Sequence, residues 1–177
     1  MFREMRRKRQ QLTEVECIEI LNKNTLGVLA VLGDNGYPYA VPLSYVYNGT
    51  ALYFHCAKSG HKLDSINSDE KVSFCVIDQD KVVPEEYTTH FRSVIIFGRA
   101  RIVGDDNEIY QAIEKIAIKY NPIDSKENRD ITIEKERAAM CIVRIDIEHM
   151  TGKEAIELAK TNSDKYDFQN QVNDIEQ

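Results

Sequence analysis

The sequence of 177 residues contains no apolar run near the roughly 20 residues that a membrane-spanning helix needs. Its N-terminus is charged and lacks the apolar segment of a signal peptide. We therefore expect a cytoplasmic protein with no membrane among its partners. The length fits one domain with a sizeable core.

Several motifs that would assign a chemistry are also missing. No Gly-x-Ser-x-Gly, Gly-x-Gly-x-x-Gly or Walker motif occurs, which argues against a serine hydrolase, a Rossmann site and a P-loop. The four cysteines form no Cys-x-x-Cys pair and no set of three metal ligands stands out, so we expect neither a metal ion nor a disulfide framework. Cys56 and Cys75 lie in strand-like runs, where a reduced cysteine usually packs as a small apolar residue.

Charge is distributed unevenly along the chain. The first nine residues carry a net charge of +4, so the remainder carries −10 if the whole chain carries −6. An acidic body argues against nucleic acid as a partner. The basic arm over residues 1–11 either contacts a phosphate or an acidic surface, or is simply a solvated terminus.

The hydrophobic pattern predicts a mainly β protein. Thr13-Glu14-Val15-Glu16 is a capping box that begins a helix ending near Asn22. Turn signals occur at Gly33-Asp34-Asn35-Gly36 and at Asn48-Gly49. We expect a short helix after Gly60 and a longer one over residues 105–120. Strands are expected over residues 26–32, 37–47, 50–57, 71–77, 93–103 and 139–147.

The remaining segments are predicted to be irregular. Polar residues 78–91 are typical of a long loop, and loops of that length are often functional. Residues 121–137 resemble a charged linker, and the tail over residues 156–177 is polar and expected to be loose from about Lys160. Because the strands follow one another in mostly sequential antiparallel order, we predict a small closed barrel.

The most informative stretch is Lys58-Ser59-Gly60-His61-Lys62, at the start of the short helix. Ser59 is the expected N-cap, and Gly60 lets the backbone approach a ligand. The positive end of a helix dipole disfavours cations, typically by about 0.3–1 kcal/mol each. The other two helix starts carry acidic residues, whereas this one carries cations, an arrangement suited to a phosphate. A solvated basic turn is the alternative.

The run over residues 37–47 has a bulky face at its odd positions and smaller residues at its even ones. Pro42 cannot donate to a sheet ladder, so we expect an edge, a bulge or a ligand surface there. The small residues Ala40, Pro42 and Ser44 leave room for a flat ring, although a plain edge strand explains the proline equally well. His55, just before the basic loop, is either structural or part of the site. A planar cofactor that carries a phosphate would fit both the basic loop and the small-residue face of this run. Flavin mononucleotide (FMN) is the natural candidate.

Four segments in combination resemble a known family. They are residues 36–45 (GYPYAVPLSY), 53–62 (YFHCAKSGHK), 91–98 (FRSVIIFG) and 149–153 (HMTGK). Over residues 1–155 the chain is similar to the flavin-binding split barrels of the pyridoxamine 5′-phosphate oxidase-like group, in particular its nitroimidazole-resistance branch. It has no Trp, and so departs from the C-terminal Arg and Trp motif of true pyridoxamine phosphate oxidases. Vitamin B6 oxidation is therefore not expected.

The resemblance implies a six-stranded antiparallel split β-barrel of Greek-key type with peripheral helices, and a homodimer with flavin at the subunit interface. It implies that residues 41–45 line the isoalloxazine ring, residues 58–62 hold the phosphate, and Ser93 reaches the flavin from the partner. Residues 78–91 would flank the substrate. The implied cofactor-binding residues are Val41, Pro42, Leu43, Ser44, Tyr45, His55, Ala57, Lys58, Ser59, Gly60, His61, Lys62 and Ser93.

Two functions follow as hypotheses. In the first, the protein is a flavin-dependent oxidoreductase that takes electrons from a nicotinamide donor and reduces a small acceptor such as a nitroimidazole. No side chain is obliged to act as acid or base, although Tyr45 and His55 are the nearest candidates. In the second, it binds flavin, or a haem-like or lipid-like ligand, without turnover. FMN and FAD both remain open, because a basic arm over residues 6–9 could stabilise a further phosphate.

Overall fold

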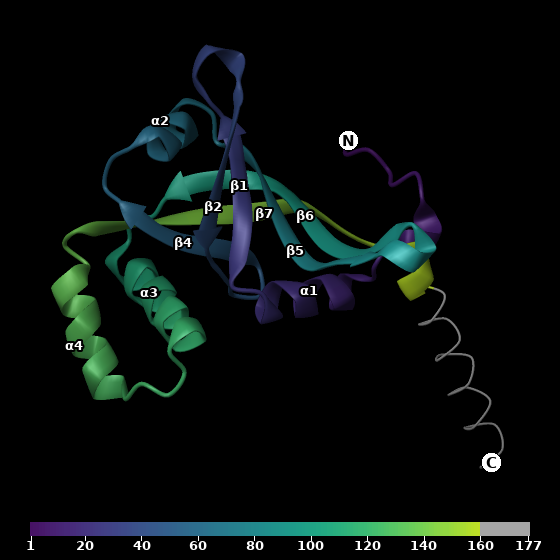
Figure 1. Cartoon of the computed structure of the whole chain (residues 1–177). Helices are drawn as coiled ribbons and strands as arrows, with labels where there is room; N and C mark the ends of the chain where they lie inside the picture. The colour runs from purple at the N-terminus through teal and green to yellow at the C-terminus, as the bar shows by residue number, and fades with distance from the viewer. Residues whose placement is uncertain (160–177) are drawn as a thin grey trace, which may run out of the picture.

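The computed structural model describes residues 1–159, so most of the predicted tail, from Lys160 onward, lies outside the described residues. One antiparallel sheet of seven strands, in the order β2-β1-β5-β6-β7-β4-β3, forms the body of the protein (Figure 1). The strands are β1 (Leu26–Leu32), β2 (Pro38–Ser44), β3 (Val46–Tyr47), β4 (Ala51–Ala57), β5 (Lys71–Val83), β6 (Thr88–Ile102) and β7 (Met140–Glu154). The helices are α1 (Glu14–Lys23), α2 (His61–Ser68), α3 (Asp106–Tyr120) and α4 (Lys126–Glu136).

A single chain segment forms both edges of this curved sheet. β2 pairs with β1 at one edge, β3 pairs with β4 at the other, and only Tyr45 separates β2 from β3. The predicted strand over residues 37–47 is therefore divided at Tyr45, which raises the strand count from six to seven. The antiparallel split-barrel class is confirmed. The expected closed barrel is instead an open sheet, because the two halves of this segment pair with different neighbours.

The hydroxyl group of Tyr120, at the end of α3, fills the break in the ladder. The Tyr45 N–H donates to the Tyr120 hydroxyl oxygen at 2.9 Å, and the same hydroxyl can donate to the carbonyl oxygen of Tyr45, at 3.1 Å, or of Thr25. Buried backbone groups need partners. Tyr120 thus supplies the hydrogen bonds that a strand neighbour would otherwise make at Tyr45, and it fixes α3 against the barrel.

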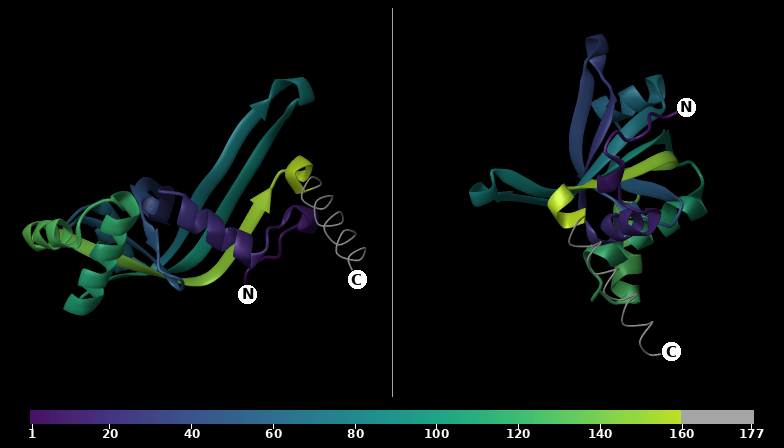
Figure 2. Two further views of the ribbon diagram at one scale, coloured as in Figure 1. Left: turned by 90° about the horizontal axis from the view of Figure 1, so that it is seen from below. Right: turned by 90° about the vertical axis from the view of Figure 1, so that its right-hand side faces the viewer.

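The predicted loop over residues 78–91 is wrong, because these residues extend β5 and β6 into a long hairpin. The two strands pair from Lys71↔Arg99 to Val83↔Thr88, with a bulge between Ile77 and Gln79. This bulge breaks the alternation of apolar and polar residues that marks a strand. Figure 2 shows the hairpin reaching away from the barrel, where both of its faces tolerate polar residues.

The predicted linker over residues 121–137 is also wrong, because it contains α4. The Ser125 side chain accepts a hydrogen bond from the Asn128 N–H and caps this helix, which buries only Ile133. A helix with so little apolar surface has the composition of a linker. Helices α3 and α4 pack together outside β4, where Ile113, Ile116 and Ile133 form a second core with Tyr53.

Other sequence predictions are confirmed. The capping box of α1 forms through Thr13 and Glu16, and the turn at residues 33–36 has a left-handed Asn35. The main core fills the barrel interior and includes Leu29, Phe54 and Phe74. No helix within residues 1–159 has both the length and the apolarity to cross a membrane.

Candidate functional site

The basic loop leads from β4 into α2 and leaves the start of that helix open. Gly60, not the predicted Ser59, is the N-cap residue, and no side chain caps the helix. Gly60 has φ 136°, a conformation that side-chain-bearing residues rarely adopt, while a β-carbon there would meet open space. The glycine therefore serves the turn itself. It leaves the first backbone N–H groups of α2 available to an anion.

The cations of this loop differ in what they contact. His61 Nε2 lies 3.5 Å from the Asp34 carboxylate. Lys58 is exposed and Lys62 half-buried, and neither forms an ion pair within the described part of the chain. The two lysines are therefore better placed than His61 to meet a ligand's negative charge.

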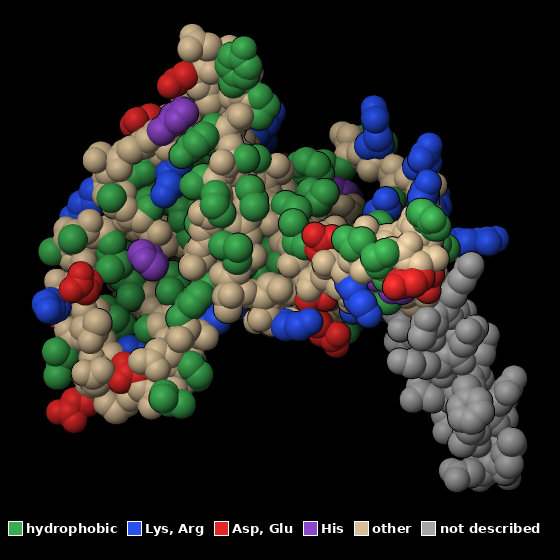
Figure 3. Space-filling view, viewed as in Figure 1, with side chains coloured by type: hydrophobic (Ala, Val, Ile, Leu, Met, Phe, Trp, Pro, Cys, Tyr) green, Lys and Arg blue, Asp and Glu red, His purple; other side chains and the backbone are tan. Residues whose placement is uncertain are grey.

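A ring stack joins the basic loop to the strand with small residues. The imidazole of His61 lies parallel to the ring of Tyr39 on β2, with ring centroids 4.2 Å apart and planes 14° apart. The stack thus places the basic loop over residues 58–62 against β2, which comes from a separate segment of the sequence. In Figure 3, histidine and basic side chains lie along the same side of the molecule as these elements.

The β2 strand presents the predicted small face. Ala40, Pro42 and Ser44 are exposed, while Val41 and Leu43 are half-buried against the barrel core. Pro42 lies opposite Val28 on an edge strand, so its missing N–H breaks no inner ladder. This edge offers an open backbone beside small side chains.

Tyr45 does not belong to that open face. Its side chain is fully buried, its hydroxyl donates to the Leu21 carbonyl oxygen at 2.9 Å, and Phe74 packs edge-on at 5.1 Å. Burial raises the pKa of Tyr45, and Lys119 Nζ lies 4.2 Å from its ring centroid. The sequence-based candidacy of the Tyr45 side chain as an acid or base is therefore corrected, because the group has no access to a ligand.

His55 and Ser44 line one pocket of about 450 Å³ against α3 and α4. Its opposite wall is largely apolar and includes Ile113, Ile116 and Ile133. Ile113 and Ile116 come from the predicted α3, whereas Ile133 comes from the unpredicted α4, for which the cap Ser125 is the only local signal. His55 is exposed, so it is free to contact a ligand in the pocket.

Two predicted contributors lie elsewhere in the same chain. Ser93 is half-buried on β6 opposite Ile77, and β1 and β5 separate β6 from β2 in the sheet. In the basic arm, Phe2 stacks on His149 of β7 at 4.6 Å, and Figure 1 shows the N-terminus at the end of the molecule away from α2. Neither reaches the basic loop of its own chain. Ala57, by contrast, is exposed directly before the loop.

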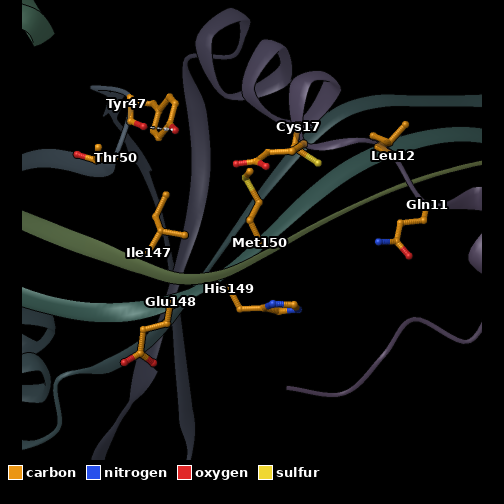
Figure 4. Close-up of a pocket in the computed structure, with 11 residues that line it drawn as sticks. Gln11, Leu12, Cys17, Tyr47, Thr50, Ile147, Glu148, His149 and Met150 are labelled. Atoms are coloured by element: carbon orange, nitrogen blue, oxygen red, sulfur yellow. Dashed lines mark hydrogen bonds between the residues drawn. The ribbon is translucent and has the colours of Figure 1, made fainter. Parts of the chain in front are cut away.

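A second cavity, of about 540 Å³, lies between α1, the β3–β4 turn and β7 (Figure 4). Tyr47, Glu148 and Met150 are among its lining residues, and His149 reaches it from β7. No lysine or arginine of the described chain lines it. It therefore lacks the charge that a phosphate group needs.

Comparison with known proteins bears on this geometry. A family model described as pyridoxamine 5′-phosphate oxidase matches residues 13–154. No curated protein sequence matches the chain. A solved structure of a candidate 5-nitroimidazole antibiotic resistance protein from Bacteroides thetaiotaomicron VPI-5482 is 18% identical, with a TM-score of 0.69 over 81% of this chain and 86% of that one.

Two further solved structures are similar. An FAD-binding protein from Mesorhizobium loti is 25% identical, with a TM-score of 0.57 over 82% of this chain and 97% of that one. An FAD- and haem-binding protein from Mycobacterium smegmatis is 20% identical, with a TM-score of 0.69 over 82% of this chain and 73% of that one. The similarity in fold thus extends over most of the described residues.

Proposed function

The chain belongs to the pyridoxamine 5′-phosphate oxidase family, and on this basis we propose that it is a cytoplasmic flavin-dependent oxidoreductase. It would take electrons from a nicotinamide donor and reduce a small acceptor, such as a nitroimidazole. The observation that carries the proposal is the Tyr39–His61 stack, because it joins the basic loop to the open edge of β2. A phosphate and a planar ring can then bind side by side.

The residues of the basic loop fit a phosphate group. Lys58 and Lys62 supply positive charge, and the uncapped start of α2 supplies backbone donors, with Ser59 beside them. Together these groups would bind the phosphate and set its position along β2. His61 contributes less charge because Asp34 is already its partner.

The ring of the flavin would lie along β2, over the exposed Ala40, Pro42 and Ser44 and against the backbone of Val41 and Leu43. When bound, the flavin supplies the electron-transfer chemistry, and the protein orients it. Ser44 and His55 continue into the apolar pocket under α3 and α4, which would hold the acceptor and exclude water from it. The solved relative that is a candidate 5-nitroimidazole resistance protein supports an acceptor of this size.

An apolar outer sheet face supports a homodimer. Ile77, Ile95 and Phe97 are exposed on β5 and β6, and this face runs through Cys75 and Val28 to Pro42 at the β2 edge. Because the apolar face is continuous with the proposed ring site, a second copy that covers it would also cover the flavin. Ser93 of the partner subunit would then reach the ring.

FMN is the cofactor we propose, because the basic arm lies away from the α2 loop of its own chain. An FAD ligand would need the arm of the second copy. Two of the similar solved structures are FAD-binding proteins, so release of FAD in place of FMN is the result that would contradict this choice.

The test is spectroscopic. The purified protein should show a flavin spectrum, release FMN on heating, be reduced by NADH or NADPH without oxygen, and be reoxidised faster when metronidazole is added. A colourless protein that takes up no added flavin would contradict the binding site. A bound flavin that no nicotinamide donor reduces would instead favour the binding protein without turnover.

A further inference from the structure

Two cysteine thiols face each other where β4 meets the start of β7. Cys56 pairs directly with Cys141 across these antiparallel strands, and their Sγ atoms lie 3.5 Å apart. Both cysteines are half-buried and free. A disulfide bond would need the sulfur atoms to approach by about 1.5 Å, a movement that side-chain rotation between directly opposed residues can supply.

The two thiols differ in their surroundings. Cys141 lines a surface pocket of about 490 Å³ together with Lys58 and Arg137. Cys56 is not among the lining residues of this pocket. Both cysteines pack against the barrel core, and burial, reinforced by the hydrogen bond with Cys141, raises the pKa of Cys56 to about 12. Cys141 is therefore the thiol that an oxidant from solvent meets first.

We propose that Cys56 and Cys141 form a redox-active dithiol site whose oxidant is hydrogen peroxide. The Cys141 thiolate attacks a peroxide oxygen, the O–O bond breaks, and Cys141 becomes a sulfenic acid while water leaves with a proton from solvent. The Cys56 sulfur then attacks the Cys141 sulfur, the S–O bond breaks, and a second water leaves with the Cys56 proton. Two thiols are thereby oxidised to one disulfide as one hydrogen peroxide is reduced to two waters.

The site lies directly beside the basic loop. The Cys141 thiol donates to the Ala57 carbonyl oxygen at 3.5 Å, and Ala57 is the last residue of β4 before Lys58. Disulfide formation would remove the Cys141 S–H donor. It would thereby break the hydrogen bond to Ala57, directly before the basic loop. The proposal does not depend on flavin binding, since it rests on the two thiols alone.

The test uses the full chain, treated with hydrogen peroxide, alkylated with N-ethylmaleimide and analysed by intact mass and peptide mapping. We expect an intramolecular Cys56–Cys141 link that dithiothreitol reverses. In Cys56→Ser the reaction should stop at a sulfenic acid on Cys141, which dimedone traps. In Cys141→Ser the oxidation of Cys56 should be at least about tenfold slower.

Cys75→Ser is the matched control, because Cys75 is also half-buried on a strand but lies opposite Val28 and Ile95. It should form the same link as the wild type. The wild-type map needs no variant, so it stands even if a substitution impairs folding. A link that involves Cys75 or Cys17, a dimedone adduct on Cys56 in the wild type, or no link at all would overturn the proposal.

Discussion

Lys58 and Lys62 carry the charge argument for the site, because His61 is held by Tyr39 and Asp34. Lys62 is half-buried, so solvent screens its charge less than that of the exposed Lys58. The identity of each loop residue could be read from the sequence. The division of roles among them could not, because it depends on Asp34 and Tyr39, which come from a distant hairpin.

Replacing Lys62 with alanine should weaken flavin binding. Loss of a charge-assisted hydrogen bond to the phosphate should cost about 1–3 kcal/mol of binding free energy. Lys58→Ala should act in the same direction, and His61→Ala should cost less than either. Quenching of flavin fluorescence during titration measures each affinity. The control is Lys81→Ala, which replaces an exposed lysine on the distant hairpin. Equal flavin affinities for Lys62→Ala and Lys81→Ala would mean that the phosphate binds elsewhere.

Tyr120→Phe should destabilise the fold, because it removes the only side-chain hydroxyl that bonds the Tyr45 backbone within the described residues. An unpaired backbone group costs about 1–3 kcal/mol, and the partial exposure of Tyr120 favours the lower end. Urea unfolding measures the change. Tyr110→Phe, whose hydroxyl bonds the Asp130 side chain on the helical surface, should change the free energy of unfolding less.

At the scale of elements, the β5–β6 hairpin depends on the bulge at Asp78. The Asp78 carboxylate has a side-chain exposure of only 4% and lies 2.9 Å from Lys23 Nζ and from Asn24 Nδ2, at the end of α1. Burial alone would raise the pKa of this carboxyl, but the hydrogen bonds from Asn24 and Lys23 outweigh it and lower the pKa below 3.8. The bulge thus ties the hairpin to α1.

This lowered pKa gives the hairpin a pH dependence of defined sign. Since the unfolded chain takes up the proton first, the contribution of Asp78 is complete above its ordinary pKa and is lost as the pH falls through the lower folded value. The stability difference between wild type and Asp78→Asn should therefore be large at pH 7 and should shrink as the pH falls from about 5 to below 3.8. Thermal unfolding across that range measures it. Asp80→Asn, which removes an exposed carboxylate from the same hairpin, is the control and should change the stability less at pH 7.

Helix α4 shows how an element can escape sequence analysis. Its single buried residue, Ile133, gives no periodic apolar stripe, so only the Ser125 cap marks it. Yet it supplies one wall of the pocket beside His55. The predicted α1 and α3 succeeded for the opposite reason, because each carries an N-cap side chain and an apolar stripe against the barrel.

At the scale of the whole molecule, β5 and β6 expose apolar side chains on their outer face, among them Ile77 and Ile95. Exposed apolar groups in one contiguous patch usually mark an interaction surface. Ile95 is 40% exposed at the centre of this face, opposite Cys75. In the proposed homodimer, a second copy would cover this face and complete the proposed flavin site.

Ile95→Asp should therefore convert a dimer to a monomer and weaken flavin binding at the same time. A buried charge without a partner disfavours the interface. Size-exclusion chromatography with light scattering measures the mass, and flavin titration measures the affinity. Ile131→Asp is the matched control, because Ile131 is exposed on α4, away from this face. A monomeric wild type that binds flavin fully would contradict the interface.

Local sequence patterns were enough to predict the antiparallel β class, the capped α1 and α3, the small-residue face of β2 and the basic loop, because each depends on residues close together in the chain. The division of the segment over residues 37–47 at Tyr45, and the hydrogen bonds by which Tyr120 bridges that division, became visible only in the folded chain. The same holds for the contact of Tyr39 with His61 and for that of Cys56 with Cys141. These contacts join distant segments, and their formation depends on sheet curvature and strand register, which no local pattern encodes.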